Sequence, residues 1–214
     1  MTLALYGAGG LGREALELAR QCAGAGGDFV FLDDTREAGE CSGIPRLPLR
    51  ELGAASARGV DFVVCVGEPA LRKALFEKAL AAGLRPATLV HPTVWVPASS
   101  SIGRGCIVDP GCHIGPDVRI GDNTAVLFES NVPHDCEVGD HCVLSANAIL
   151  SGHCKVGEGA YVAAGAVVKE DVSIGSWSIV GMGSAVFRDV PDDVIALGNP
   201  ARVVKNNENH RVFG

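Results

Sequence analysis

An aliphatic residue stands at every sixth position of one long stretch, from Val96 to Val186, without interruption. The series comprises Val96, Ile102, Val108, Ile114, Ile120, Val126, Val132, Val138, Leu144, Leu150, Val156, Val162, Val168, Ile174, Val180 and Val186. A fixed period of six is typical of a parallel β-helix, in which each repeat supplies one short strand and one corner. An amphipathic helix would need a period near 3.6, which this stretch lacks. The stretch therefore predicts a solenoid of about five three-sided coils.

A second series, of small or modest side chains, precedes the aliphatic one by two residues. It holds Ser100, Cys106, Cys112, Val118, Thr124, Ser130, Cys136, Cys142, Ala148, Cys154, Ala160, Ala166, Val172, Ser178 and Ser184. Because residues two apart on a strand share a face, we expect both series to point into the coil and the residue between them to point out. A glycine often follows the aliphatic residue, as in Ile102-Gly103, and is expected to form the corner with a positive φ.

Five of the eight cysteines belong to the small inward series: Cys106, Cys112, Cys136, Cys142 and Cys154. Their spacing in multiples of six is the period of the coil and not that of a metal-ligand pair. We interpret them as small buried hydrophobes and expect no catalytic thiol among them.

The formal net charge of the 214 residues is -7, and the sequence has no basic cluster. Nothing therefore suggests a nucleic-acid or an anionic-membrane partner. No apolar run reaches the roughly twenty residues of a transmembrane helix, and no signal segment opens the chain. We expect a cytoplasmic protein.

The segment before the repeats begins with a strand, a glycine turn and a helix. The strand is expected at Thr2–Tyr6, the turn at Gly7–Gly12 and the helix at Arg13–Cys22; further strands are expected at Phe29–Leu32 and Asp61–Val66, and a further helix at Pro69–Ala82. This order is typical of a nucleotide-binding βαβ start, in which N–H groups at the helix N-terminus face a phosphate. Asp33 and Asp34 follow the last glycine at a distance that suits a bond to a ribose or a sugar.

Only about three strands precede the repeats, half of what a full dinucleotide fold requires. We interpret the segment as a small nucleotide-binding half-domain of Rossmann-like α/β type and not as an NAD site. A glycine turn that only packs the helix on the strand is the alternative.

The flanks of the solenoid offer less chemistry. His91, in the segment that leads into the repeats, is interpreted as a packing or hinge residue. After the repeats, residues 197–201 are expected to form a turn, residues 202–205 a short helix, and residues 206–214 a loosely held polar tail.

His134 lies two residues after an aliphatic position, so its imidazole is expected at a corner on the surface. Asp135 beside it could accept a hydrogen bond from one ring nitrogen and raise the basicity of the other, as in a general base with its orienting carboxylate. From the residues alone a surface histidine is the alternative, because His113, His141 and His153 also occur in the repeats.

The sequence resembles the bacterial sugar O/N-acyltransferases with hexapeptide repeats, a family that includes sialic-acid O-acetyltransferases and N-acetyltransferases of nucleotide-linked 4-amino sugars. The resemblance rests on the glycine-rich start, on Phe31-Leu32-Asp33-Asp34, Val66-Gly67-Glu68, Leu89-Val90-His91-Pro92 and His134-Asp135-Cys136, and on Gly198-Asn199-Pro200-Ala201. It implies a left-handed parallel β-helix, a homotrimer and acetyl-CoA as co-substrate.

Carried over to this sequence, the resemblance implies that His134 takes the proton from the acceptor and that Asp135 tunes it. The residues that it implies for the nucleotide-sugar are Gly9, Gly10, Leu11, Asp33, Asp34 and Gly67. For acetyl-CoA, in the cleft between two subunits, it implies Gly152, Ala164, Gly181 and Met182. Some relatives have a CoA-contacting histidine nine residues after the base; here that position is Val143, and His141 and His153 are the possible substitutes.

We therefore expect a Rossmann-like nucleotide-sugar-binding domain at residues 1–90, a β-helix acyltransferase domain at 91–205 and a polar tail at 206–214. The expected activity is N-acetylation of a nucleotide-linked 4-amino sugar, by direct transfer from acetyl-CoA with His134 as general base and no metal. The alternatives are O-acetylation of sialic acid or a related sugar, and a non-catalytic scaffold that binds a nucleotide-sugar. A metal site like that of γ-carbonic anhydrases is a weaker alternative, because the histidine spacings supply no convincing set of three.

Overall fold

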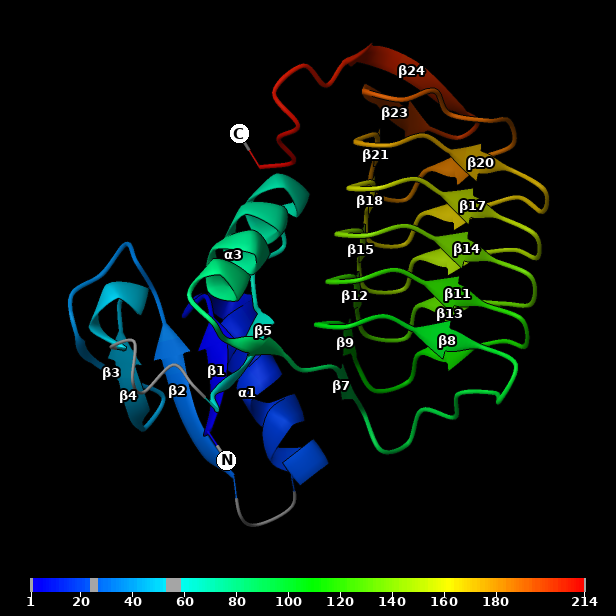
Figure 1. Ribbon diagram of the computed structural model, residues 1–214. Coiled ribbons are helices and arrows are strands. Elements are labelled where there is room, and N and C mark those ends of the chain that lie inside the picture. Colours follow the sequence, from blue (N-terminus) through cyan, green and yellow to red (C-terminus); the bar gives the residue numbers. More distant parts are fainter. Residues whose placement is uncertain (1, 24–26, 53–58, 214) are drawn as a thin grey trace.

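The computed structural model describes residues 2–23, 27–52 and 59–213, which form an α/β part and a solenoid lying side by side (Figure 1). Residues 1, 24–26 and 53–58 of the predicted first domain and residue 214 of the predicted tail lie outside the described residues. Within the described ranges, no helix combines the length and apolar character needed to cross a membrane.

The α/β part is one six-stranded sheet in the order β3-β4-β2-β1-β5-β6. Its elements are β1 (Thr2–Tyr6), α1 (Gly10–Ala23), β2 (Asp28–Leu32), β3 (Gly39–Cys41), β4 (Ile44–Leu47), η2 (Leu49–Glu51), β5 (Asp61–Val64), α3 (Pro69–Ala81) and β6 (Arg85–Pro86). The predicted strands and helices are confirmed, with small shifts at their ends. The sequence pattern missed three short strands: β3 and β6, which form the two edges of the sheet, and β4, which lies next to β3.

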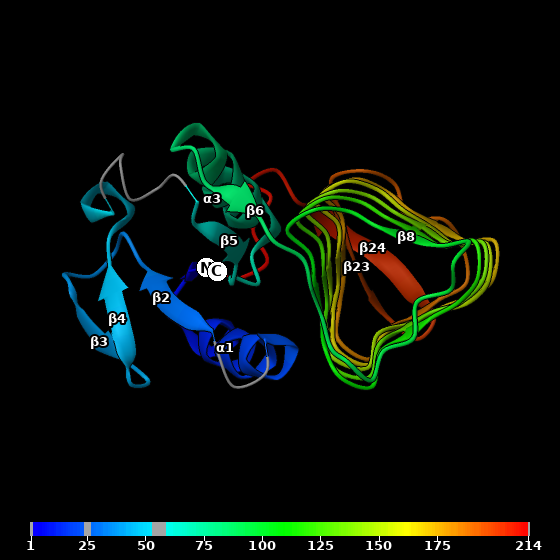
Figure 2. The same ribbon diagram turned by 60° about the horizontal axis from the view of Figure 1, so that its bottom comes forward.

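The solenoid consists of three parallel sheets that form the sides of a triangle (Figure 2). Its strands are β7 (Leu89–Val90), β8 (Ser101–Ile102), β9 (Ile107–Val108), β10 (His113–Ile114), β11 (Arg119–Ile120), β12 (Ala125–Val126), β13 (Asn131–Val132), β14 (Glu137–Val138), β15 (Val143–Leu144), β16 (Ile149–Leu150), β17 (Lys155–Val156), β18 (Tyr161–Val162), β19 (Val167–Val168), β20 (Ser173–Ile174), β21 (Ile179–Val180), β22 (Ala185–Val186), β23 (Val194–Gly198) and β24 (Ala201–Asn206). Two faces hold five strands each, and the third holds eight, from β7 to β24. Followed from β8 away from the viewer in Figure 2, the chain turns counter-clockwise, so the coil is left-handed, as expected.

Both inward series of the repeat fill the solenoid core. Cys106, Val108, Cys142 and Leu144 are all fully buried, with the small slot and the aliphatic position alternating around the triangle. The cysteines donate to carbonyl groups of the neighbouring turns, for example Cys106 Sγ to the Gly121 carbonyl at 3.0 Å. All eight cysteines are free thiols, and the five in the slots are buried small side chains, as predicted.

The glycines that follow the aliphatic residues do not supply the corner conformation, so that expectation was wrong. The positive φ falls two residues later, for example at Gly105 and Asp117. Gly103 and Gly115 are required for another reason: a Cβ at Gly115 would lie 2.5 Å from the backbone nitrogen of His134 in the next coil. Close stacking of the coils, and not corner geometry, therefore selects these glycines.

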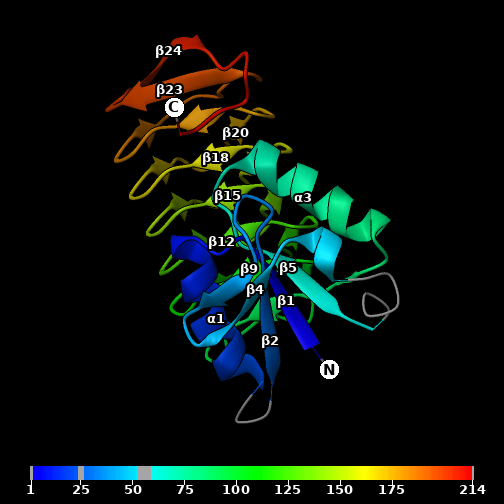
Figure 3. The same ribbon diagram turned by 90° about the vertical axis from the view of Figure 1, so that its left-hand side faces the viewer.

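Helix α1 packs on one face of the α/β sheet and on the eight-stranded face of the solenoid, whereas α3 packs on the other face of the sheet and contacts the turns before β12 and β15 (Figure 2). Leu16 of α1 belongs to one buried cluster with Ile107, Ala125 and Val143, which are outward-facing residues of β9, β12 and β15. The α/β part covers the first coils, while β23 and β24 project beyond it (Figure 3). One face of the solenoid is thereby closed to solvent by the chain's own α/β part.

Arg72 of α3 ties the two parts together although it is fully buried. Its guanidinium donates to the carbonyls of Val64 and Val66, at the end of β5, and to the carbonyl of Asn123 in the solenoid, at 2.9–3.1 Å. Burial lowers the pKa of Arg72 to about 10, so the group stays charged at neutral pH. Backbone carbonyls therefore take the place of a carboxylate partner.

The C-terminal segment differs from the expected short helix and loose tail. Residues 201–206 form β24, which pairs antiparallel with β23 and closes the end of the eight-stranded face. The chain then returns to the α/β part, where the N–H groups of Val212 and Phe213 donate to the Glu68 carboxylate at 2.8 and 3.1 Å. His210 stacks on Trp177 with ring centroids 4.8 Å apart. The tail is thus held by both parts of the molecule.

Candidate active site

The residues predicted to hold a nucleotide-sugar gather at one edge of the α/β sheet. β1, β2 and β5 run parallel as neighbours, so their carboxyl ends meet there. Gly9, Gly10 and Leu11 open α1 after β1, Asp33 and Asp34 follow β2, and Gly67 follows β5. A Cβ at Gly9 or Gly10 would meet no atom within 4 Å, so the backbone at this helix N-terminus is open to a ligand.

The two aspartates at this edge are engaged within the chain. Asp33 accepts from the backbone N–H and the hydroxyl of Thr35 at 3.0 and 2.6 Å. Asp34 accepts from the Tyr6 hydroxyl, from Lys78 Nζ at 2.6 Å and from the Leu49 N–H at 2.8 Å. These hydrogen bonds lower the pKa of Asp34 despite its partial burial. Asp34 therefore links β1, η2 and α3 at this edge of the sheet, in addition to any contact that it makes with a ligand.

Gly67 faces the C-terminal tail. A Cβ on Gly67 would lie 3.6 Å from the ring of Phe213, which also packs edge-on against Tyr161 of β18. The tail thus forms one wall beside the predicted nucleotide residues, a contact that the polar composition of residues 206–214 did not reveal.

His134 and Asp135 lie in the turn between β13 and β14, where they form the pair that the sequence predicted. His134 Nδ1 and Asp135 Oδ2 are 2.9 Å apart, and about half of each side chain is exposed. Asp135 occupies the corner position with φ of 59°, which directs its carboxylate back toward the imidazole. The second ring nitrogen, Nε2, lies next to Gly152.

The ring of His134 packs against Gly152. This glycine lies one coil, or 18 residues, after His134, and a Cβ there would stand 2.5 Å from Cε1 and 2.8 Å from Nε2 of that imidazole. His153, the next residue, donates its backbone N–H to the His134 carbonyl at 3.2 Å. The rings of His134 and His153 meet edge to face, with centroids 5.2 Å apart. Adding the coil length of 18 to positions 134 and 135 would have found both neighbours in the sequence.

The position nine residues after His134 cannot contact a ligand in this subunit. Val143 faces outward from β15 and is buried against α1. Of the two possible substitutes, His141 is buried beside Phe76 of α3 with its Nδ1 2.9 Å from Asn123 Nδ2, and burial lowers its pKa. Only His153 lies at the His134 turn.

The residues predicted for acetyl-CoA occupy two different corners. Gly152 lies at the corner of His134, whereas Ala164, Gly181 and Met182 follow β18 and β21, strands of the eight-stranded face, at another corner. Met182 is 80% exposed. The face that holds β10, β13, β16, β19 and β22 lies between these two corners.

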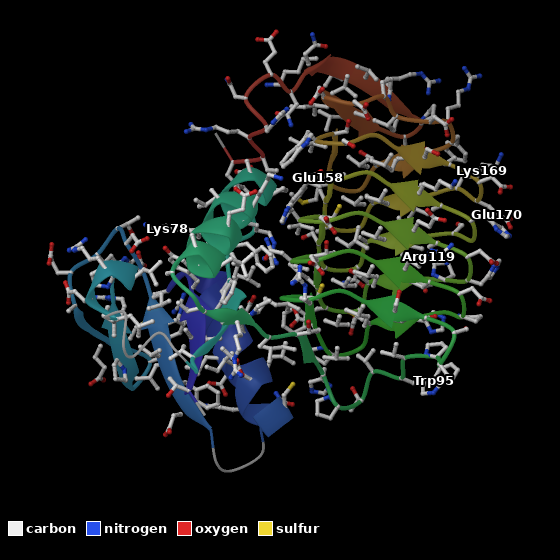
Figure 4. The ribbon with its side chains drawn as sticks, viewed as in Figure 1. Lys78, Trp95, Arg119, Glu158, Lys169 and Glu170 are labelled. Carbon is white, nitrogen blue, oxygen red and sulfur yellow. The ribbon has the colours of Figure 1, made fainter. Side chains whose placement is uncertain are left out.

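A groove on the face formed by β8, β11, β14, β17 and β20 adds residues that the sequence did not single out. It has a volume of about 510 Å³ and is lined by Arg119 and Lys155, among others. Arg119 (Figure 4) and Lys155 occupy outward positions of β11 and β17, the strands on either side of β14, which follows the His134 turn. In the sequence, each of them lies between a small inward residue and the aliphatic residue of its repeat, and this outward position was the only indication of their role.

Asp109, in the turn after β9, is a buried carboxylate that the sequence analysis overlooked. It is 1% exposed, and its Oδ2 has no hydrogen-bond partner among the residues that the structure describes. Burial raises its pKa from 3.8 to about 6.

The predicted base and the predicted nucleotide site lie on opposite sides of the solenoid. The His134 turn joins the two five-stranded faces, so it forms the corner opposite the eight-stranded face that the α/β part covers. Lys169 and Glu170, in the equivalent turn after β19, mark this outer edge in Figure 4. Within one subunit, Gly9 and Gly10 and the His134 turn are therefore on opposite sides of the solenoid.

Two protein families match this chain in succession. Residues 2–79 match the PglD N-terminal domain, and residues 88–188 match the GMPPB C-terminal domain. Among curated proteins, the GDP-perosamine N-acetyltransferase of Escherichia coli O157:H7 is 31% identical over 136 residues, which span 62% of this chain and 62% of that protein.

Several solved structures are similar over almost the whole chain. One is a variant of the perosamine N-acetyltransferase from Caulobacter crescentus, with a histidine replaced by asparagine, in complex with CoA and GDP-perosamine. It is 32% identical, covers 96% of this chain and 98% of its own, and has a TM-score of 0.88. Another is the acetyltransferase domain of PglB from Neisseria gonorrhoeae in complex with acetyl coenzyme A. It is 32% identical, covers 95% of this chain and 98% of its own, and has a TM-score of 0.87.

Proposed function

Because this chain belongs to the hexapeptide-repeat sugar N-acetyltransferases, we propose that it transfers the acetyl group of acetyl-CoA to the amine of a nucleotide-linked 4-amino sugar. The enzyme class and the co-substrate are those of the family: the chain is an acetyl-CoA-dependent sugar acetyltransferase. Relatives in complex with CoA and GDP-perosamine support a nucleotide-linked amino sugar as the acceptor.

The observation that carries the mechanism is the His134–Asp135 pair seated on Gly152. With its Nδ1–H donated to Asp135, the imidazole has a free lone pair on Nε2. The acceptor nitrogen attacks the thioester carbonyl, Nε2 takes the proton from that nitrogen, and the tetrahedral intermediate collapses to the amide and CoA thiolate, which receives the proton. A backbone N–H near Gly152 stabilises the oxyanion. The histidine replaced in two of the relatives' complexes supports a histidine in this role.

The active form in this proposal is a homotrimer with shared sites. The α/β part of one subunit presents the nucleotide-sugar to His134 of the next, because the two predicted sites lie on opposite sides of one solenoid. Gly152, Ala164, Gly181 and Met182, at two corners of one chain, would then contact CoA in the cleft between neighbouring subunits. We place the protein in the cytoplasm, in keeping with its eight free thiols.

The proposal also divides the chain by role. Residues 1–90 bind the nucleotide-sugar, with Gly9, Gly10, Leu11, Asp33, Asp34 and Gly67 as its contacts; residues 91–205 carry out the transfer, and residues 206–214 form the tail that joins the two.

The test is release of CoA, followed with a thiol reagent, for wild type and His134→Ala. The acceptors are UDP-, GDP- and dTDP-linked 4-amino sugars, with free sialic acid as the competing class. We expect release with an amino sugar and a loss of about 10²–10⁴-fold in the variant, the usual contribution of a general base. Wild-type turnover in the variant would exclude His134, and release with sialic acid alone would exclude the amine acceptor.

Shared sites are tested by mixing two inactive variants. Gly10→Tyr fills the open helix N-terminus, and His134→Ala removes the base. Co-expressed subunits should recover activity, because some sites in a mixed trimer combine the intact α/β part of one chain with the intact base of another. Absence of recovery in mixed trimers of verified composition would place both functions in one subunit. Sedimentation velocity checks the trimer itself.

A further inference from the structure

We propose that His134, Asp135 and His153 form a Zn²⁺ site, and that Zn²⁺ bound there blocks the enzyme by occupying its base. The three side chains offer two imidazole nitrogens and one carboxylate oxygen, all within 4.8 Å of one another. Two imidazoles and a carboxylate with an open fourth position are a common zinc ligand set, whereas Mg²⁺ prefers oxygen ligands.

The ligand atoms are already close to the spacing that a tetrahedral ion needs. His134 Nδ1 and Asp135 Oδ2 are 2.9 Å apart, and His153 Nε2 and the same oxygen are 3.8 Å apart. Ligands at about 2.0–2.2 Å from a tetrahedral ion stand roughly 3.3–3.5 Å from one another. The two imidazole nitrogens lie within 4.8 Å of each other, so rotation of the half-exposed side chains has to close that separation by up to about 1.3 Å.

The solenoid holds the ligands in register. Asp135 and His153 occupy the same corner position in successive coils, with φ of 59° at both. The backbone bond from the His153 N–H to the His134 carbonyl fixes the spacing between these coils. A site on stacked coils is set by the backbone and does not depend on a mobile loop.

Metal binding at Nδ1 would remove the base without removing the histidine. In the resting pair, the ring proton lies on Nδ1 and is donated to Asp135, which leaves Nε2 free to accept a proton. With Zn²⁺ on Nδ1, the single proton of the neutral imidazole lies on Nε2, so the nitrogen that faces the acceptor cannot take another. Asp135 would at the same time leave the imidazole and bind the metal.

Binding is measured first, independently of turnover. We expect isothermal titration of the metal-free protein with Zn²⁺ to give one site per chain, and Co²⁺ to give the visible absorption of a four-coordinate ion. His153→Asn should weaken binding by about tenfold or more. His113→Asn, which removes an exposed histidine of β10 outside the cluster, should leave binding unchanged. Equal binding by His153→Asn and wild type would overturn the site.

Inhibition rests on the proposed function and is measured separately. CoA release at increasing Zn²⁺ is compared with the metal-free rate of the same variant, with a chelator to restore it. We expect half-inhibition at about the Zn²⁺ concentration that half-fills the site, and a shift of about tenfold or more in His153→Asn but none in His113→Asn. Full activity with the site filled would refute the blocking role. A protein that binds Zn²⁺ but acetylates no acceptor would refute the proposed function and leave the metal site standing.

Discussion

Replacing Gly152 by alanine should impair the function of His134 although the histidine itself is unchanged. The added Cβ would stand 2.5 Å from Cε1 and 2.8 Å from Nε2 of the imidazole. Ordinary contact begins near 3.4 Å, so the ring has to move by about 0.9 Å. A misplacement of this size in a catalytic group can cost about 10²-fold. We expect kcat to fall by about that factor, and less than in His134→Ala.

The assay is CoA release under saturating acetyl-CoA, with thermal unfolding as the check on folding. Gly152 has no positive φ, so alanine adds no backbone strain there. The decisive comparison is the double variant Gly152→Ala/His134→Ala, which should be no slower than His134→Ala alone, because alanine keeps the backbone N–H and its added methyl group acts through the imidazole ring. If the losses of kcat in the two single variants multiply in the double variant, Gly152 acts on the thioester directly. Wild-type turnover in Gly152→Ala would refute the argument that Gly152 positions the His134 ring.

Three further predictions concern other parts of the molecule. Asp135→Asn keeps the shape of the turn but removes the carboxylate that orients His134, so kcat should fall by about 10- to 100-fold with little change in the melting temperature; an unchanged kcat would remove Asp135 from the mechanism. Burial raises the pKa of Asp109 from 3.8 to about 6, so the folded chain binds more protons than the unfolded chain between these values, and stability falls as the pH rises through this window. Asp109→Asn should abolish this fall and raise the free energy of unfolding at pH 8 by about 3 kcal/mol, and parallel urea-unfolding profiles of variant and wild type from pH 4 to pH 8 would contradict this. Arg72→Met leaves three buried carbonyls without their donor and should destabilise the fold by about 1–3 kcal/mol for each one left unsatisfied; denaturant unfolding that matched wild type would show that water replaces the guanidinium.

The pair proposed as catalytic could be predicted from the sequence because it is local. His134 and Asp135 are neighbours, and the repeat places them on a corner whatever the rest of the molecule does. The contact of His134 with Gly152 and the nearby His153 could also be derived, because three six-residue repeats in each coil place residues 18 apart in neighbouring coils side by side.

Other parts of the site depended on packing that no local pattern records. Val143 and His141 look like any outward or corner residue of the repeat, yet α1 and α3 bury them. The last residues read as a polar tail, but two backbone N–H groups find the Glu68 carboxylate on the far part of the molecule. Composition indicates whether a segment can be exposed to water, but not which distant group it contacts.

The sequence by itself determined the solenoid, its inward and outward side chains and the βαβ start, because each follows from a spacing of two, six or a few residues along the chain. The tertiary structure alone decided which face of the triangle the α/β part covers, and therefore that the predicted nucleotide site and His134 lie on opposite sides of one subunit. The three faces carry the same repeat, so the choice among them rests on packing, in which outward apolar residues of β9, β12 and β15 form the surface that α1 buries.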